Sequence, residues 1–160
     1  TTVLDTRTHG PTPMVHPTTG NIYIGDTYGG VHALSPDGVE FAQADLGSGR
    51  IVGPTALSAD GNAIYVLTTD GRVHGLNASN LTARPGFPVR ASRNKYKIYG
   101  QAPVVDADGV IYAGGADGIL RAIRPDGTIK WSAPLGGRIS TPTVTNGGLI
   151  VPSGHELYQF

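Results

Sequence analysis

Two histidines occupy the same place in two similar strings of this sequence, Val31-His32-Ala33 and Val73-His74-Gly75. A neutral imidazole can ligate a metal ion or line a polar interface or channel, so a repeated histidine is a candidate functional residue. The corresponding positions of two further strings hold Arg121 and Tyr158. Because side chains alternate between the two faces of a strand, the pattern favours one face of a repeated strand over a metal site.

An acidic string, Asp106-Ala107-Asp108-Gly109, has the alternating carboxylates of a calcium loop. Calcium needs six or more oxygen ligands, and the residues that follow, Val110-Ile111-Tyr112, have the pattern of a strand instead. The string is therefore predicted to be a turn. The sequence has no cysteine, which excludes thiolate metal sites and cysteine nucleophiles. It also has no Gly-x-Ser-x-Gly nucleophile elbow, and we expect no catalytic, metal-binding or cofactor-binding residue.

The segment 80–99 concentrates basic residues and is predicted to form a lengthened strand and connecting loop. Loops often carry recognition residues. We predict a recognition loop formed by Arg90, Arg93, Lys95, Tyr96, Lys97 and Tyr99; a solvated connection is the alternative. Asn77 and Asn80 begin N-glycosylation sequons in a predicted exposed turn, which favours an extracellular or periplasmic location.

The charge balance narrows the range of partners. Lysine plus arginine and aspartate plus glutamate number 12 each, so no basic footprint points to nucleic acid. No apolar stretch approaches the length of a membrane-spanning helix, and we expect no membrane insertion. The composition thus leaves protein, or a glycan, as the expected partner.

A repeated unit must position these residues. The centres of four apolar runs, Tyr23, Tyr65, Tyr112 and Ile150, are 42, 47 and 38 residues apart. Paired helices can have a similar period, but these runs are only four to six residues long and are bounded by Asp-Gly, Gly-Gly or proline. Four short strands per unit are typical of a β-propeller blade.

The first unit shows the expected strands, at 14–15, 21–24, 31–34 and 40–42. We predict one all-β domain over 1–160, a β-propeller of about four blades with four antiparallel strands each. The blade units are approximately 11–46, 52–91, 100–135 and 140–160, and residues 1–6 complete the last one.

The two ends of the chain do not coincide with the beginning and end of a blade unit. Val3 and Leu4 align with the last strand of a unit, whereas Leu157, Tyr158 and Phe160 fall at its third strand. We predict that these residues form the edges at which the ring closes, because propellers protect unpaired strand edges. A closed four-bladed ring, an eight-bladed ring of two chains, a filament with strand exchange and a segment of a larger propeller all remain open.

The third unit reads Leu120-Arg121-Ala122-Ile123, then Asp126-Gly127, then Trp131, and it resembles the PQQ-like (quinoprotein-type) β-propeller repeat. The resemblance implies that an aromatic ring near the end of each unit docks neighbouring blades. At those positions stand Phe41, Phe87 and Trp131.

None of the family's quinone-binding or calcium-binding residues can be transferred to this chain. The resemblance therefore implies a non-enzymatic binding or assembly module that presents loops and strand edges to protein or glycan partners, with self-assembly through strand exchange as one form. The alternative is a fragment of a PQQ-dependent dehydrogenase whose cofactor residues lie outside this chain.

Overall fold

The computed structural model describes residues 12–47, 49–93 and 100–160, and these residues form strands and turns without any helix. The strands build four separate antiparallel sheets. No described helix could therefore cross a membrane. The predicted all-β class and the four-stranded antiparallel blade are confirmed.

Each sheet is a meander in which consecutive strands pair. The first sheet contains β1 (Met14–Val15), β2 (Ile22–Gly25), β3 (Gly30–Leu34) and β4 (Glu40–Asp45). The second contains β5 (Ala56–Leu57), β6 (Ala63–Leu67), β7 (Arg72–Asn77) and β8 (Val89–Arg90). The third contains β9 (Val104–Val105), β10 (Ile111–Ala113), β11 (Ile119–Ile123) and β12 (Ile129–Pro134). The fourth contains β13 (Thr143–Thr145), β14 (Gly148–Ser153) and β15 (Glu156–Gln159).

Asp-Gly pairs close the hairpins, as their sequence predicts. Gly71, Gly118 and Gly127 have φ values of 87°, 69° and 85°. A side chain disfavours these left-handed values, whereas glycine adopts them readily. The meander therefore depends on short turns that these glycines make possible.

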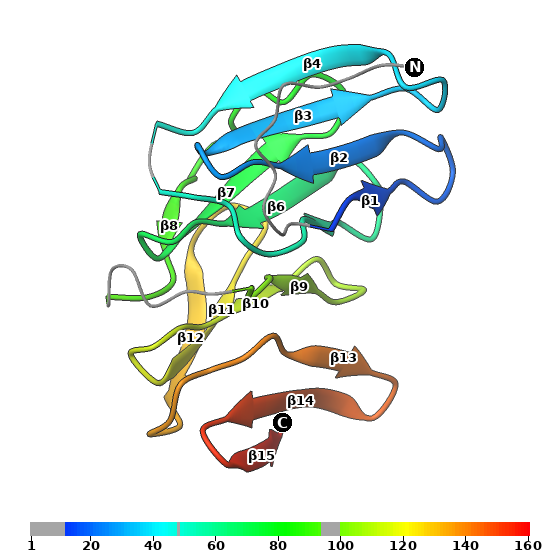
Figure 1. Cartoon of the computed structure of the whole chain (residues 1–160). Helices are drawn as coiled ribbons and strands as arrows, with labels where there is room; N and C mark the ends of the chain where they lie inside the picture. The colour runs from blue at the N-terminus through cyan, green and yellow to red at the C-terminus, as the bar shows by residue number, and fades with distance from the viewer. Residues whose placement is uncertain (1–11, 48, 94–99) are drawn as a thin grey trace.

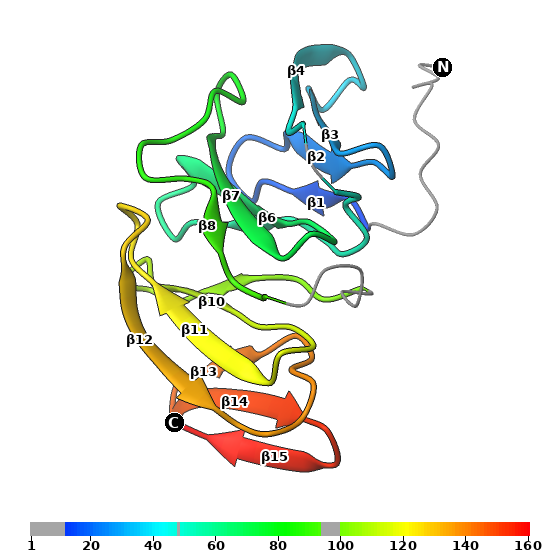
Figure 2. The same cartoon turned by 90° about the vertical axis from the view of Figure 1, so that its left-hand side faces the viewer.

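The four sheets follow one another in an open arc, with the β1–β4 sheet and the β13–β15 sheet at opposite ends (Figures 1 and 2). Apolar side chains fill each of the three junctions between consecutive sheets. In β6, Ile64 and Val66 pack towards the first sheet, while Ala63, Tyr65 and Leu67 pack towards the third. Burial on both faces explains why the run Ala63–Leu67 is apolar without interruption.

One predicted strand is corrected by the structure, and another lies outside the described residues. The described part of the segment 80–99, residues 80–93, contains no lengthened strand. Its strand β8 has two residues, and before β8 only isolated contacts join the connection to β7, among them the Leu76–Ala83 bridge and the hydrogen bond from the Arg84 amide to the Gly75 carbonyl. The predicted closing strand around Val3 and Leu4 lies outside the described residues. Within the described part of the chain, the fourth sheet has three strands and β15 is its edge.

Candidate functional site

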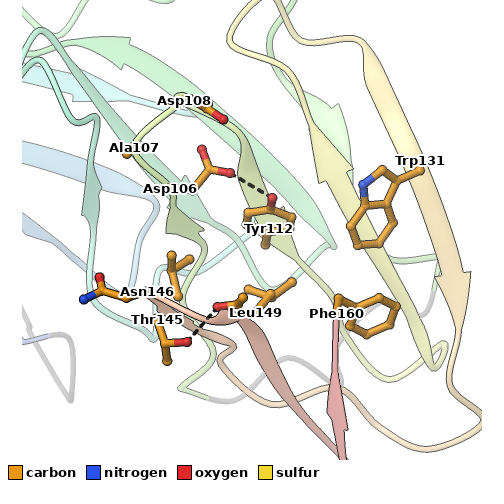
Figure 3. A pocket seen from close by; sticks show the side chains of 11 residues that line it. Asp106, Ala107, Asp108, Tyr112, Trp131, Thr145, Asn146, Leu149 and Phe160 are labelled. Carbon is orange, nitrogen blue, oxygen red and sulfur yellow. Dashed lines mark hydrogen bonds between the residues drawn. The ribbon is translucent and has the colours of Figure 1, made fainter.

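A groove of about 740 Å³ opens between the third and fourth sheets (Figure 3). It lies at the end of the arc, where β15 is an edge strand (Figure 1). Its lining combines aromatic, acidic and amide side chains. The lining residues are Asp106, Ala107, Asp108, Tyr112, Trp131, Val144, Thr145, Asn146, Gly148, Leu149 and Phe160.

Three aromatic rings form one wall of this groove. Trp131 and Phe160 are stacked, with their ring centroids 5.5 Å apart and their planes inclined by 21°. Tyr112 meets Trp131 at 5.9 Å and 48°. Phe160 is nevertheless 47% exposed, so the wall offers apolar surface to a partner. Partly exposed aromatic rings of this kind are common in protein interfaces.

Asp106 acts as a structural residue beside Tyr112 in the same groove (Figure 3). Its Oδ1 accepts a hydrogen bond of 2.8 Å from the Val110 amide, and its Oδ2 accepts one of 2.8 Å from the Tyr112 hydroxyl. Burial, reinforced by this bond to Asp106, raises the pKa of Tyr112 to about 12. The acidic string is thus a turn that also fixes the tyrosine, and the described residues contain no group of three or more histidines and acids that could hold a metal.

The outer edge of β15 is the second part of the site. Leu149 and Phe160 exchange two backbone hydrogen bonds of 2.9 Å. In an antiparallel ladder such pairs alternate with pairs that do not bond each other. Leu157 and Gln159 therefore direct their backbone groups away from β14, and Leu157 is 71% exposed. Within the described residues, this edge has no strand beside it.

The third strand of each sheet has a polar residue at the same position, and its environment differs from sheet to sheet. The four residues are His32, His74, Arg121 and Tyr158. In the first sheet, His32 Nε2 lies 3.1 Å from Asp26 Oδ2 and its Nδ1 lies 2.6 Å from Glu40 Oε1. Burial alone would raise the pKa of Asp26. Hydrogen bonds from the Gly30 amide, His32 and the Tyr28 amide outweigh that effect and lower it.

In the third and fourth sheets this position ties neighbouring sheets together. Arg121 pairs with Asp117 at 3.0 Å and donates a hydrogen bond to the Ala91 carbonyl, just after β8 of the preceding sheet. The Tyr158 hydroxyl donates in the same way to the Leu135 carbonyl, just after β12, at 3.1 Å. Both acceptors follow the last strand of the preceding sheet directly.

His74 differs from its three counterparts because no hydrogen bond reaches its ring from the described residues. Its Nε2 is buried without a partner. Burial lowers the pKa of His74 to about 4, so the imidazole is neutral at pH 7. The sequence places His74 in the repeat but gives no sign of this isolation, because its partners depend on which residues pair across strands.

The predicted docking aromatics fall into two kinds. Trp131 packs into the junction between the third and fourth sheets, and Phe87 packs between the second and third, where its ring lies 5.5 Å from that of Tyr65. Phe41 is a wrong assignment. Ala33 pairs with Ala42 as Ala122 pairs with Trp131, so Ala42 is the register counterpart of Trp131, and the Phe41 side chain is 42% exposed.

The predicted recognition loop is described only in part. Arg90 ends β8 and is exposed, and Arg93 is exposed with its amide hydrogen-bonded to Asp117 Oδ2 at 3.1 Å. Lys95, Tyr96, Lys97 and Tyr99 lie outside the described residues. Of the two described members, neither Arg90 nor Arg93 lines the groove beside β15.

No family model and no curated protein matches this sequence. The fold, however, is shared with solved structures. BamB from Moraxella catarrhalis superposes with a TM-score of 0.76 at 23% identity, over 94% of this chain and 45% of that chain. The WD40 domain of Toxoplasma gondii coronin gives 0.74 at 15% identity, over 92% and 42%. This chain has a β-propeller fold.

The comparison also gives a measure of size. The chain spans less than half the length of each of these two propellers. Its four sheets correspond to an arc of such a propeller, in agreement with Figures 1 and 2. At these identities the likeness concerns the fold alone, and the resemblance to PQQ-like repeats remains a prediction from the sequence.

Proposed function

We propose that this chain is a non-enzymatic β-propeller module that binds protein by accepting a strand along β15, and that the partner is a second copy of the chain. The observation that carries the proposal is the outer edge of β15, which has no neighbouring strand among the described residues. An exposed edge with outward backbone donors and acceptors pairs readily with another strand.

The groove beside this edge supplies apolar surface for the same partner. Phe160 follows β15 directly and stacks on Trp131, so a segment laid along β15 reaches the aromatic wall within one residue. Main-chain hydrogen bonds would give such a complex its affinity, while the groove would select the side chains that enter it.

A second copy suits the geometry because the chain forms an arc. Its first and fourth sheets lie at opposite ends (Figures 1 and 2), and one chain corresponds to 45% and 42% of the two propellers compared. Two copies would supply nearly the number of strands in such a ring. Symmetric pairing of two chains closes the assembly, whereas one chain alone leaves an edge exposed.

The strand that is added would be residues 2–5, which the sequence predicts to have the pattern of a closing strand. Residues 1–11 lie outside the described part of the chain, so this assignment rests on the sequence. An extracellular or periplasmic location remains part of the proposal and rests on the sequons at Asn77 and Asn80.

A peptide titration tests where the strand binds. Isotope-labelled chain without residues 1–5, in which no strand of a second copy can already lie along β15, is titrated with a synthetic peptide of residues 1–11, and amide shifts are followed by NMR. We expect saturable shifts at Leu157 and Gln159 and at the Trp131 indole, with none from a scrambled peptide. Shifts confined to other sheets, or no shifts at all, would reject β15 as the acceptor.

A further inference from the structure

A second cavity, of about 400 Å³, lies between the first and second sheets, away from the groove beside β15. Its wall is mainly apolar, and includes Leu46, Leu76, Leu81, Ala83 and Phe87. His74 lines the same cavity. An apolar cavity with a small number of polar groups is the usual form of a small-molecule site.

The unusual feature of this cavity is the state of His74. The side chain is only 6% exposed, and its Nε2 is buried without a hydrogen-bond partner among the described residues. Buried polar groups in proteins are nearly always hydrogen-bonded, and one that is not suggests that water or a ligand binds there. The equivalent His32, Arg121 and Tyr158 all have partners.

Strand register explains how the cavity arises. In the first sheet, His32 is held by Asp26 and Glu40. Thr68 takes the place of Asp26 in the second sheet. The amide of each residue donates a hydrogen bond to the carbonyl of the first residue of the next strand. Ala83 takes the place of Glu40 in the second sheet. Ala83 forms a bridge with Leu76, and Leu76 is the equivalent of Leu34, with which Glu40 pairs. Both carboxylates are thus replaced, and space is left beside the imidazole.

The arginine that lines the cavity is paired with a carboxylate, since Arg72 Nε lies 3.3 Å from Asp70 Oδ2. Asp45 is exposed at the cavity, and its Oδ1 accepts a hydrogen bond of 2.8 Å from the Gly47 amide. His74 is neutral at pH 7 because burial lowers its pKa to about 4. Burying an anion here would carry a desolvation penalty without a free cation among the described lining residues to offset it.

We infer that this cavity is a binding site for a small uncharged molecule that has an apolar body and one hydroxyl group, the hydroxyl bonding to the His74 imidazole. The apolar wall receives the body of the ligand, and the neutral ring accepts or donates the one hydrogen bond. This site is independent of strand addition at β15. It lies between sheets that do not include β15, and its ligand is not a protein.

Histidine-ring NMR of the full-length chain tests the inference, with phenol as the probe. Toluene has the same apolar body without the hydroxyl, and benzoate carries a charge in its place. We expect phenol to shift the His74 ring resonances saturably while those of His32 stay in place. The dissociation constant for phenol should be at least fivefold lower than those for toluene and benzoate.

Two variants locate the binding. His74→Leu should remove the preference for phenol over toluene, and Ala83→Phe should abolish binding of both by filling the cavity. If either variant fails to fold, as judged by its amide spectrum, the other still decides the question. Phenol that leaves the His74 ring unshifted, or that binds no better than toluene, would show a cavity that holds water only and would overturn the inference.

Discussion

At the scale of single residues, one position on the third strand of each sheet controls how neighbouring sheets are joined. Arg121 and Tyr158 bond to carbonyls that follow the last strand of the preceding sheet. Strand register places the Leu46 carbonyl, which follows β4, in the equivalent position for His74. His74 makes no such bond, so the junction between the first and second sheets lacks this tie.

Restoring the tie should stabilise the chain. In His74→Tyr the new hydroxyl can donate to the Leu46 carbonyl, as Tyr158 donates to Leu135. One added hydrogen bond stabilises a protein by about 1 kcal/mol. Urea unfolding should therefore show His74→Tyr to be more stable than His74→Phe, which fills the same space without a hydroxyl. Equal stability of the two variants would mean that no tie forms.

His74 also makes a prediction about pH. Its pKa is about 4 in the folded chain, against about 6.5 when unfolded. Below pH 6.5 the unfolded state binds more protons than the folded state, so the free energy of unfolding falls as the pH decreases from 6.5 to 4. Between pH 7 and pH 4.5 this loss amounts to about 2 to 3 kcal/mol.

Urea unfolding of His74→Phe at both pH values isolates this contribution, because carboxyl groups titrate alike in the two proteins. The variant should lose about 2 to 3 kcal/mol less than the parent chain over this range. A parallel decline in both proteins would show that His74 is protonated as easily in the folded state as in the unfolded one.

Of the three aromatic residues predicted from the repeat, Phe87 and Trp131 pack between sheets and Phe41 does not. Trp131→Ala should cost about 3 kcal/mol of unfolding free energy, because its ring contacts Tyr112 and Phe160 and packs at the junction of the last two sheets. Phe41→Ala should cost about 0.5 kcal/mol, since that side chain is largely exposed. Similar losses for the two variants would contradict the register described here.

At the scale of elements, the open edge of β15 is the feature with the clearest consequence. The Gln159 amide faces away from β14, so Gln159→Pro removes a donor that only an added strand would use. We expect this variant to bind the 1–11 peptide at least tenfold more weakly in the NMR titration, whereas Gln159→Ala, which keeps the amide, binds normally. Undiminished binding by the proline variant would exclude pairing at this edge.

The strands themselves could be predicted from the sequence, because Asp-Gly and Gly-Gly turns leave only short apolar runs between them. The docking position of the first sheet was wrongly assigned to Phe41 because that residue is aromatic, whereas the pairing of β3 with β4 puts Ala42 there. The two-residue length of β8 was missed because it depends on how far that segment pairs with β7. Sequence spacing counts residues along the chain, whereas pairing between strands decides which of them share a face.

The groove and the His74 cavity could not be predicted from the sequence either. Tyr112 and Trp131 come from one repeat and Phe160 from the next, and only the packing of consecutive sheets brings them together. His74 is isolated because Thr68 and Ala83 stand where another sheet has carboxylates. Such sites form between repeats, so a description of one repeat cannot contain them.

At the scale of the whole molecule, the chain is an arc of a β-propeller with three apolar junctions, and its fourth sheet has no strand beyond β15 among the described residues. The arc spans less than half of each of the two propellers compared. A propeller normally closes its ring and so removes its edges. We propose that a second copy provides this closure, with strand addition at β15 as the contact.

The native mass of the full-length chain tests this claim most directly. Sedimentation equilibrium at several concentrations should give twice the 16.6 kDa mass of one chain, and deletion of residues 1–5 should reduce it to that of a single chain. A mass of 16.6 kDa for the parent chain at all concentrations, or a dimer that the deletion leaves intact, would contradict strand exchange between two copies.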